Sequence, residues 1–135
     1  MYKCKHFGIK ELVSKKVYED RGTKAWGLLD ERALKTLDAL RDRFGPITVN
    51  DWSWGGANQY RGFREADCDV GAEYSQHRFG RADDCTFRDI SAEVVRQYIL
   101  DNPDEFPYIS SIEMGVSWLH FGVGNHGPGI LTFYP

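Results

Sequence analysis

The ten residues 75–84, Ser-Gln-His-Arg-Phe-Gly-Arg-Ala-Asp-Asp, constrain the fold of this chain more than any other segment. His77 and Asp84 are seven positions apart, and Gly80 between them lets the backbone turn, so that both side chains can converge on one cation. A neutral imidazole and a carboxylate are common zinc ligands, and a hydrolytic zinc site has three protein ligands and one open position. The segment therefore predicts two ligands of a metal site and requires a third.

His120 is the best candidate for the third ligand. It lies in the segment 116–123, Val-Ser-Trp-Leu-His-Phe-Gly-Val, whose alternating large apolar residues predict a β-strand. Such a strand can bring the imidazole to the same place as His77 and Asp84. The alternative is a core histidine on an apolar strand, and the combination of the three residues favours the metal site.

The pattern S-x-H-x-x-G-x-A-x-D, followed by W-x-H at Trp118–His120, resembles the zinc D-Ala-D-Ala carboxypeptidase family, and in particular its small single-domain members from phages and prophages. The resemblance covers most of residues 28–125. It implies a compact α+β domain with a small antiparallel sheet, flanking helices and a zinc site at the sheet, as in hedgehog and DD-peptidase folds. It also implies hydrolysis of peptide bonds in peptidoglycan stem peptides.

A zinc hydrolase also needs a group that takes a proton from water and returns it to the leaving amine. Many relatives have an acid three residues before the final histidine, where this chain has Ser117, which is no base at neutral pH. Glu113 is the nearest upstream carboxylate and is our candidate, with Asp83 as the weaker alternative. Relatives often have a further acid two residues after the final histidine, where this chain has Gly122.

Two further positions are candidates for substrate binding. Arg61 stands where relatives carry an arginine that resembles a clamp for a substrate carboxylate or carbonyl, a task that suits a planar fork of donors. Arg64 is its close rival, and a surface salt bridge is the alternative for either arginine. Ser75 can orient His77 or the substrate, or can simply cap a local turn. The remaining histidines, His6 and His126, fit no ligand spacing and are expected at the surface.

The rest of the sequence predicts helices and short strands in an α+β arrangement. We expect helices over about 8–18, from Asp30 to Phe44 with Leu34, Leu37, Leu40 and Phe44 on one face, and from Ser91 to Asp101 with Val94, Val95, Tyr98 and Ile99 on one face. Strands are expected over 47–49, 85–87, 109–113 and 116–123, with an edge strand at 130–133, and an irregular excursion over 59–74.

Composition limits the partners and the setting. A chain of 135 residues fits one domain over 1–135, and its formal charge of −3 shows no basic excess of the kind that captures nucleic acid. Cys4, Cys68 and Cys85 match neither a disulfide scaffold nor a C-x-x-C zinc site, which favours a reducing compartment. The sequence has no secretory signal and no run of roughly 20 apolar residues that could cross a bilayer. We therefore expect a protein made in the cytoplasm, and we expect it to be a monomer. The cell-wall substrate that the resemblance implies would then be reached at lysis or as part of a virion.

These observations predict a zinc metallopeptidase in which His77, Asp84 and His120 hold the ion and Glu113 handles protons. It would act on peptidoglycan stem peptides, as a carboxypeptidase at a terminal D-Ala or as an endopeptidase of the endolysin type. A binding module that keeps the zinc site without turnover, for wall recognition or as a structural part of a virion, is the alternative from a different class.

Overall fold

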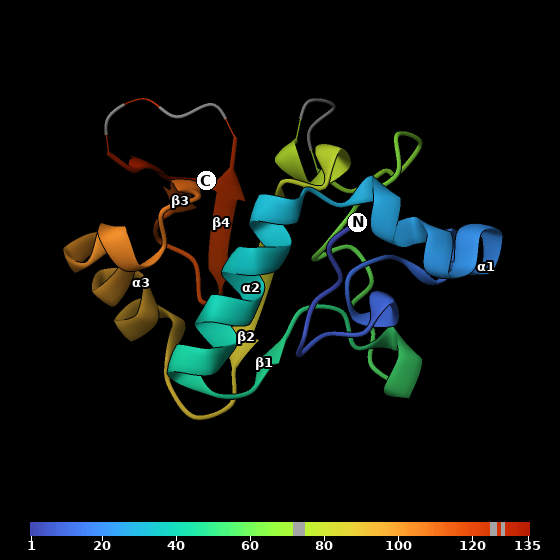
Figure 1. The fold of residues 1–135 in the computed structure, drawn as a ribbon, viewed down its shortest axis with the longest axis horizontal. Helices are drawn as coiled ribbons and strands as arrows, with labels where there is room; N and C mark the ends of the chain where they lie inside the picture. The colour runs from blue at the N-terminus through green and yellow to red at the C-terminus, as the bar shows by residue number, and fades with distance from the viewer. Residues whose placement is uncertain (72–74, 125–126, 128) are drawn as a thin grey trace.

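A computed structural model describes residues 1–71, 75–124, 127 and 129–135. The described residues form three α-helices and five strands, joined by loops and short 3-10 turns (Figure 1). The helices are α1 (Lys15–Arg21), α2 (Glu31–Phe44) and α3 (Ala92–Asp101). The strands are β1 (Ile47–Thr48), β2 (Ala82–Phe87), β3 (Ile109–Glu113), β4 (Leu119–Val123) and β5 (Leu131–Phe133). No helix of the described residues is long and apolar enough to cross a membrane.

The five strands form one sheet in the order β1-β2-β4-β3-β5. Neighbouring strands are antiparallel except for β3 and β5, which are parallel. The sheet is therefore mixed, and the expectation of an antiparallel sheet was wrong at this edge. The reason is topological: β2 and β3 occupy both edges of β4, so the strand that follows β4 cannot pair with β4 itself and instead pairs at the outer edge of β3. A strand that runs antiparallel to β4 at that position is parallel to β3.

The hydrophobic core lies between the sheet and the helices α2 and α3. In β4 the side chains of Leu119, Phe121 and Val123 are buried against the helices, and the residues between them face the other side of the sheet. Cys85 of β2 lies in the same core. The sheet consequently has a helix-covered face and an opposite face, and α2 crosses the first of these in front of β2 (Figure 1).

Helix α2 forms as its sequence predicts. The carboxylate of Asp30 accepts a hydrogen bond from the backbone N–H of Arg32 and so caps the first turn, and Gly45 ends the helix at a positive φ of 86°. Leu34, Leu37 and Leu40 are buried in the core, whereas Phe44 is only partly buried at its edge.

The N-terminal helix expected over 8–18 does not form as one unit. A 3-10 turn (Ile9–Glu11) is followed by a break at Ser14, whose hydroxyl accepts a hydrogen bond from Val17 N and caps α1. The apolar residues of this predicted helix are all buried: Ile9, Leu12, Val13 and Val17. They lie in the 3-10 turn, in the bend that follows it and in α1, and not in one helix. The pattern therefore predicted burial correctly and the helix incorrectly, because a buried serine that accepts a backbone N–H starts a new helix.

Helix α3 spans the predicted residues, and of its predicted face Val95 and Ile99 are buried and Tyr98 is partly buried. Its buried residues are Ala92, Val95, Arg96 and Ile99, whereas Val94 is 55% exposed. An arginine thus occupies a core-facing position that the apolar pattern assigned to valine.

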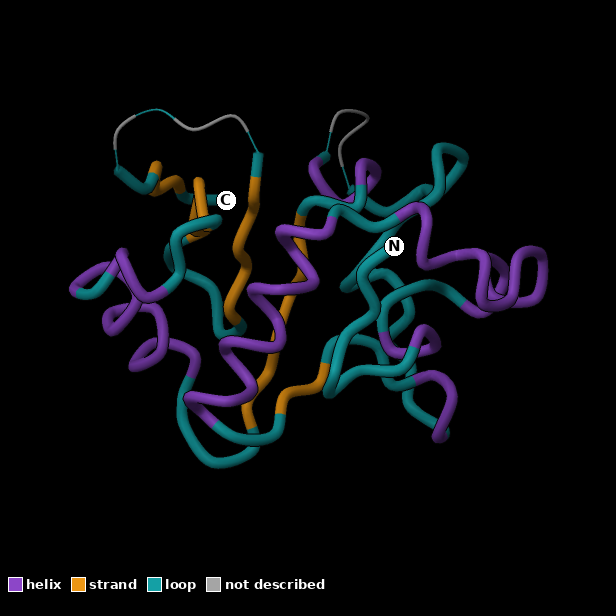
Figure 2. The backbone as a smooth tube through the Cα atoms, viewed as in Figure 1, coloured by secondary structure: helices purple, strands orange, loops and turns teal. Residues whose placement is uncertain are grey.

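The other strand predictions hold with small shifts. β3 has the predicted bounds, β4 begins at Leu119 because residues 115–118 form a bend, and β5 is the predicted edge strand. Between β1 and β2 the described chain contains only loops and two 3-10 turns, as expected for an irregular excursion (Figure 2). This excursion is the segment that supports the site described next.

Candidate metal centre

Asp84 and His120 are direct partners across two neighbouring strands. In the antiparallel register of β2 and β4, Asp84 stands opposite His120 and Asp83 opposite Phe121. Because Phe121 is fully buried on the helix-covered face, Asp84 and His120 both project from the opposite face. The pleat of the sheet therefore brings together two residues that are 36 positions apart in the chain.

His77 reaches the same point from a 3-10 turn (Gln76–Phe79) just before β2. Ser75 caps this turn, since its Oγ accepts a hydrogen bond from His77 N at 3.3 Å. Gly80 ends the turn at a φ of 66°, and a Cβ there would lie 2.3 Å from the backbone carbonyl oxygen of Leu28. Only glycine fits both constraints, so the tight reversal between His77 and β2 requires it.

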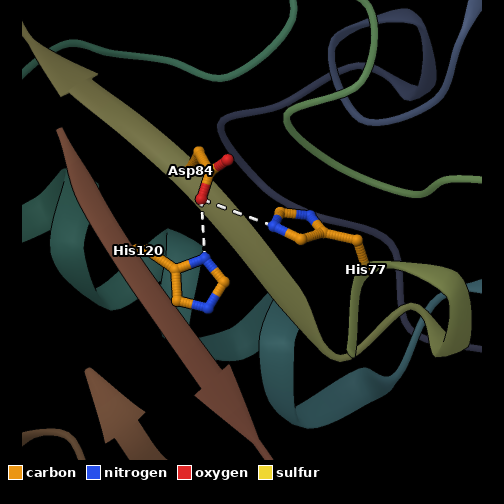
Figure 3. A group of neighbouring side chains, drawn as sticks. All are labelled: His77, Asp84 and His120. Atoms are coloured by element: carbon orange, nitrogen blue, oxygen red, sulfur yellow. Dashed lines mark hydrogen bonds and ion pairs between the residues drawn. The ribbon is translucent and has the colours of Figure 1, made fainter. Parts of the chain in front are cut away.

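The three side chains converge on one oxygen atom. His120 Nδ1 lies 2.7 Å and His77 Nε2 lies 3.4 Å from Asp84 Oδ1, and the two imidazole rings are 5.1 Å apart between centroids. Figure 3 shows both rings turned toward this carboxylate. Ligand atoms of the three residues all lie within 4.8 Å of one another. The cluster can therefore hold a metal ion, as the sequence predicted.

The charge state of Asp84 suits a ligand. Burial by itself raises the pKa of this carboxyl, but the hydrogen bond from His120 and the proximity of the His77 ring outweigh burial and hold the pKa well below its ordinary value. Arg64 adds a positive charge on the other side, with Nη2 3.7 Å from Asp84 Oδ2. Asp84 is consequently an anion, which is the form that binds a cation.

The backbone of residues 61–64 supports two members of the cluster, His77 and Asp84. Gly62 O lies 2.8 Å from His77 Nδ1, Arg64 N donates to His77 O at 3.1 Å, and Asp84 N donates to Arg61 O at 2.8 Å. A carbonyl oxygen only accepts hydrogen bonds, so His77 Nδ1 carries the proton and the lone pair of the neutral ring is on Nε2, toward Asp84. This arrangement is the one that metal-binding histidines use, and it suits His77 to the role of a metal ligand.

A pocket of about 540 Å³ surrounds the cluster on the open face of the sheet. Besides the three candidate ligands it is lined by Arg64, Ser75, Gln76, Ser111, Glu113, Trp118, Leu131 and Phe133. Glu113 ends β3 on the same face as His120, because its neighbour Ile112 pairs with Phe121 in the core. The structure thus places the predicted general base in the same pocket as the predicted ligands.

The two candidate arginines take different positions. Arg64 lies beside Asp84 in the pocket, and burial lowers the pKa of its guanidinium while Asp84 partly restores it. Arg61 lines an adjoining pocket of about 270 Å³, with its guanidinium carbon 5.7 Å from the centroid of the Trp118 ring. Arg64, Asp84 and Trp118 line both pockets, so the two pockets adjoin.

The other acidic, hydroxyl and imidazole residues named in the sequence analysis are not part of the cluster. Asp83 is buried on the helix-covered face, where burial first and Asp84 second raise the pKa of its carboxyl, so it is poorly placed to exchange protons with a ligand in the pocket. Ser117 is exposed in the bend before β4. His6 Nε2 pairs with Asp42 at 2.6 Å outside the site, and His126 lies outside the described residues.

Two supporting residues escaped sequence reasoning. Gly62 acts through its carbonyl oxygen, and a backbone acceptor leaves no signature in the identity of a residue. Phe133 packs edge-on against His120 with ring centroids 5.7 Å apart, a contact that depends on the parallel pairing of β5. The hydrophobic pattern of the last strand could have indicated an apolar wall, but not which residue it covers.

Comparison of the chain with protein-family models, with curated proteins and with solved structures found no match.

Proposed function

We propose that this protein is a zinc metallopeptidase that hydrolyses peptide bonds in peptidoglycan stem peptides, as a D-Ala-D-Ala carboxypeptidase or as an endopeptidase of the endolysin type. One observation carries the proposal: His77, Asp84 and His120 converge in a pocket that also holds a carboxylate, Glu113, and a guanidinium, Arg64. In this proposal, the protein acts on the bacterial cell wall after release at lysis or as part of a virion.

The residues of the pocket divide the work of peptide hydrolysis. His77, Asp84 and His120 would hold a zinc ion, which would supply Lewis acidity for the attack of water on the scissile carbonyl. Glu113 accepts a proton from the attacking water and returns it to the leaving amine. Arg64, with Arg61 at the adjoining surface, donates hydrogen bonds to a carboxylate or carbonyl of the substrate. Ser75 fixes the turn that carries His77.

A zinc-containing module without turnover is the second candidate, for binding to the wall or for a structural role in a virion. It is favoured by two positions where an acid would assist catalysis and none is present, Ser117 and Gly122. A Cβ at Gly122 would lie 2.5 Å from Ser111 Oγ, so an acid at that position would require the Ser111 hydroxyl to rotate. Glu113 is then the residue on which the two candidates differ.

Metal content and wall cutting test the proposal together. The purified protein is expected to hold about one zinc ion per chain, and alanine at His77, Asp84 or His120 is expected to abolish retention. Zymography on purified cell walls separates the candidates, because a binding module sediments with the wall and leaves it uncut. A protein that takes up no zinc would refute both candidates, and a zinc protein that binds walls without cutting them would refute the peptidase.

A further inference from the structure

Arg96 is the largest fully buried side chain of the described residues, with 1% of its surface exposed. It lies on the core face of α3 among Ala92, Val95 and Ile99, a position where an apolar residue would normally pack. Burying a guanidinium costs several kcal/mol unless hydrogen bonds satisfy its donors. Arg96 is therefore expected to have a role that an apolar side chain could not fill.

The guanidinium of Arg96 binds the backbone just before β4. Nη1 donates to the carbonyl oxygen of Trp118 at 2.9 Å, and Nη2 donates to that of Val116 at 2.8 Å and to Glu93 Oε2 at 2.9 Å. Residues 115–118 form a bend outside the strand ladder, so these carbonyl groups have no strand partner within the part of the chain that the structure describes. Arg96 supplies the donors that the sheet does not supply.

This bend carries two parts of the metal centre. Trp118 lines the metal pocket and the adjoining arginine pocket, and the third candidate ligand, His120, follows two residues later. We infer that Arg96 is a positioning residue, which clamps the bend from the helix-covered side and so sets the place of the Trp118 ring and of His120 on the open face. The inference rests on the proposed metal centre, and Arg96 itself touches neither ligand nor substrate.

A purely stabilising role makes a different prediction. Replacing a buried ionic group by an apolar residue of similar volume is often neutral or stabilising. If Arg96 served only the packing of α3, Arg96→Met would leave the site unchanged in any folded protein. If Arg96 positions the bend, Arg96→Met gives a folded protein in which the bend has lost both of its donors and the site is altered.

The test compares Arg96→Met and Arg96→Lys with Glu93→Gln, which removes the ion pair but keeps both bonds to the bend. Three quantities are measured: zinc affinity by chelator competition, the visible absorption of bound Co²⁺, which reports coordination geometry, and the indole ¹H–¹⁵N signal of Trp118 in the metal-free protein, assigned with Trp118→Phe. We expect Arg96→Met to weaken zinc binding about tenfold, the lower end of the effect of residues that orient metal ligands. It also shifts the cobalt spectrum and the indole signal.

Arg96→Lys keeps a charged donor and is expected to fall between Arg96→Met and the wild type, while Glu93→Gln matches the wild type. Wild-type values of all three quantities in Arg96→Met would overturn the inference. Loss of folding in both Arg96 variants would also overturn it, because Arg96 would then serve the whole domain. If the wild type binds no metal, the proposed function fails, and the indole signal alone decides: a shift in Arg96→Met but not in Glu93→Gln supports the clamp, and no shift refutes it.

Discussion

Replacing Gly62 by alanine is expected to weaken metal binding although Gly62 is no ligand. A Cβ at this position would lie 2.3 Å from the backbone carbonyl oxygen of Leu12. Non-bonded heavy atoms prefer separations of about 3.5 Å, so the two backbone segments must move apart by about 1 Å. Phe63 N donates to the same Leu12 oxygen at 2.8 Å, which holds the two segments together in the wild type.

The displacement disturbs the bond that orients His77. Gly62 O lies 2.8 Å from His77 Nδ1 in the wild type. A shift of Gly62 by about 1 Å toward or away from His77 takes this distance outside the usual range of about 2.7–3.2 Å. Loss of a hydrogen bond that orients a metal-binding histidine weakens metal affinity about 10–100-fold, or about 1.4 to 2.8 kcal/mol. Overpacking also lowers the free energy of unfolding of the metal-free protein by about 1–3 kcal/mol.

Chelator competition measures the zinc affinity, and urea unfolding of the metal-free protein measures stability. Gly27→Ala is the matched control, because a Cβ there would lie 3.7 Å from Met1 Cε, an ordinary contact. The control is expected to keep the wild-type affinity. If Gly62→Ala binds zinc as tightly as the control, the reasoning that the 61–64 segment orients His77 is wrong.

Three further predictions concern other parts of the molecule. Glu113→Gln should retain zinc and lose wall-cutting activity by about 10²–10⁴-fold, the usual contribution of a general base; full activity with full zinc would exclude Glu113 from this role. Gly80→Ala, which meets a backbone oxygen at 2.3 Å, should lower the melting temperature more than Gly55→Ala, where φ is also positive but the described residues leave open space; equal losses would mean that only the φ strain of about 1–2 kcal/mol matters. The hydrogen bond from Tyr2 to Asp38, followed by burial, raises the pKa of Tyr2 to about 12. The pKa of Tyr2 in the unfolded chain is about 10, so the hydrogen bond contributes its full stability below pH 10 and loses it as the pH rises through the folded pKa. Between these two pH values the wild type should therefore lose more stability in urea unfolding than Tyr2→Phe does.

The parts of the fold that the sequence predicted well are those with strong local signals. Helix α2 has an aspartate cap, a regular leucine face and a terminal glycine, and β3 has a break at Met114-Gly115 after it. The N-terminal helix failed because the buried Ser14 offers its hydroxyl to a backbone N–H, and the apolar spacing contains no sign of that bond. The parallel pairing of β5 depends on which edges remain free in the assembled sheet, which no local pattern encodes.

The candidate site divides in the same way. His77, Asp84 and His120 were predicted to converge, and the structure brings them together, while the identity of the ion stays a prediction. Their supports were not predictable, because Gly62 acts through a carbonyl oxygen and Arg96 holds two carbonyl oxygens from a position that an apolar pattern ignores. The sequence left Arg61 and Arg64 as rivals, and their different positions along the two pockets depend on the fold of the loop that carries both.

Because Asp84 and His120 are direct partners across β2 and β4, a bound metal ion would favour the native register of these two strands. If β4 slipped by one residue against β2, His120 would turn to the helix-covered face and Phe121 to the open one. A slipped sheet therefore has no complete ligand set, and an ion that binds the native register alone lowers the free energy of that register only. The ion would then select between competing strand alignments during folding, before it takes part in any chemistry.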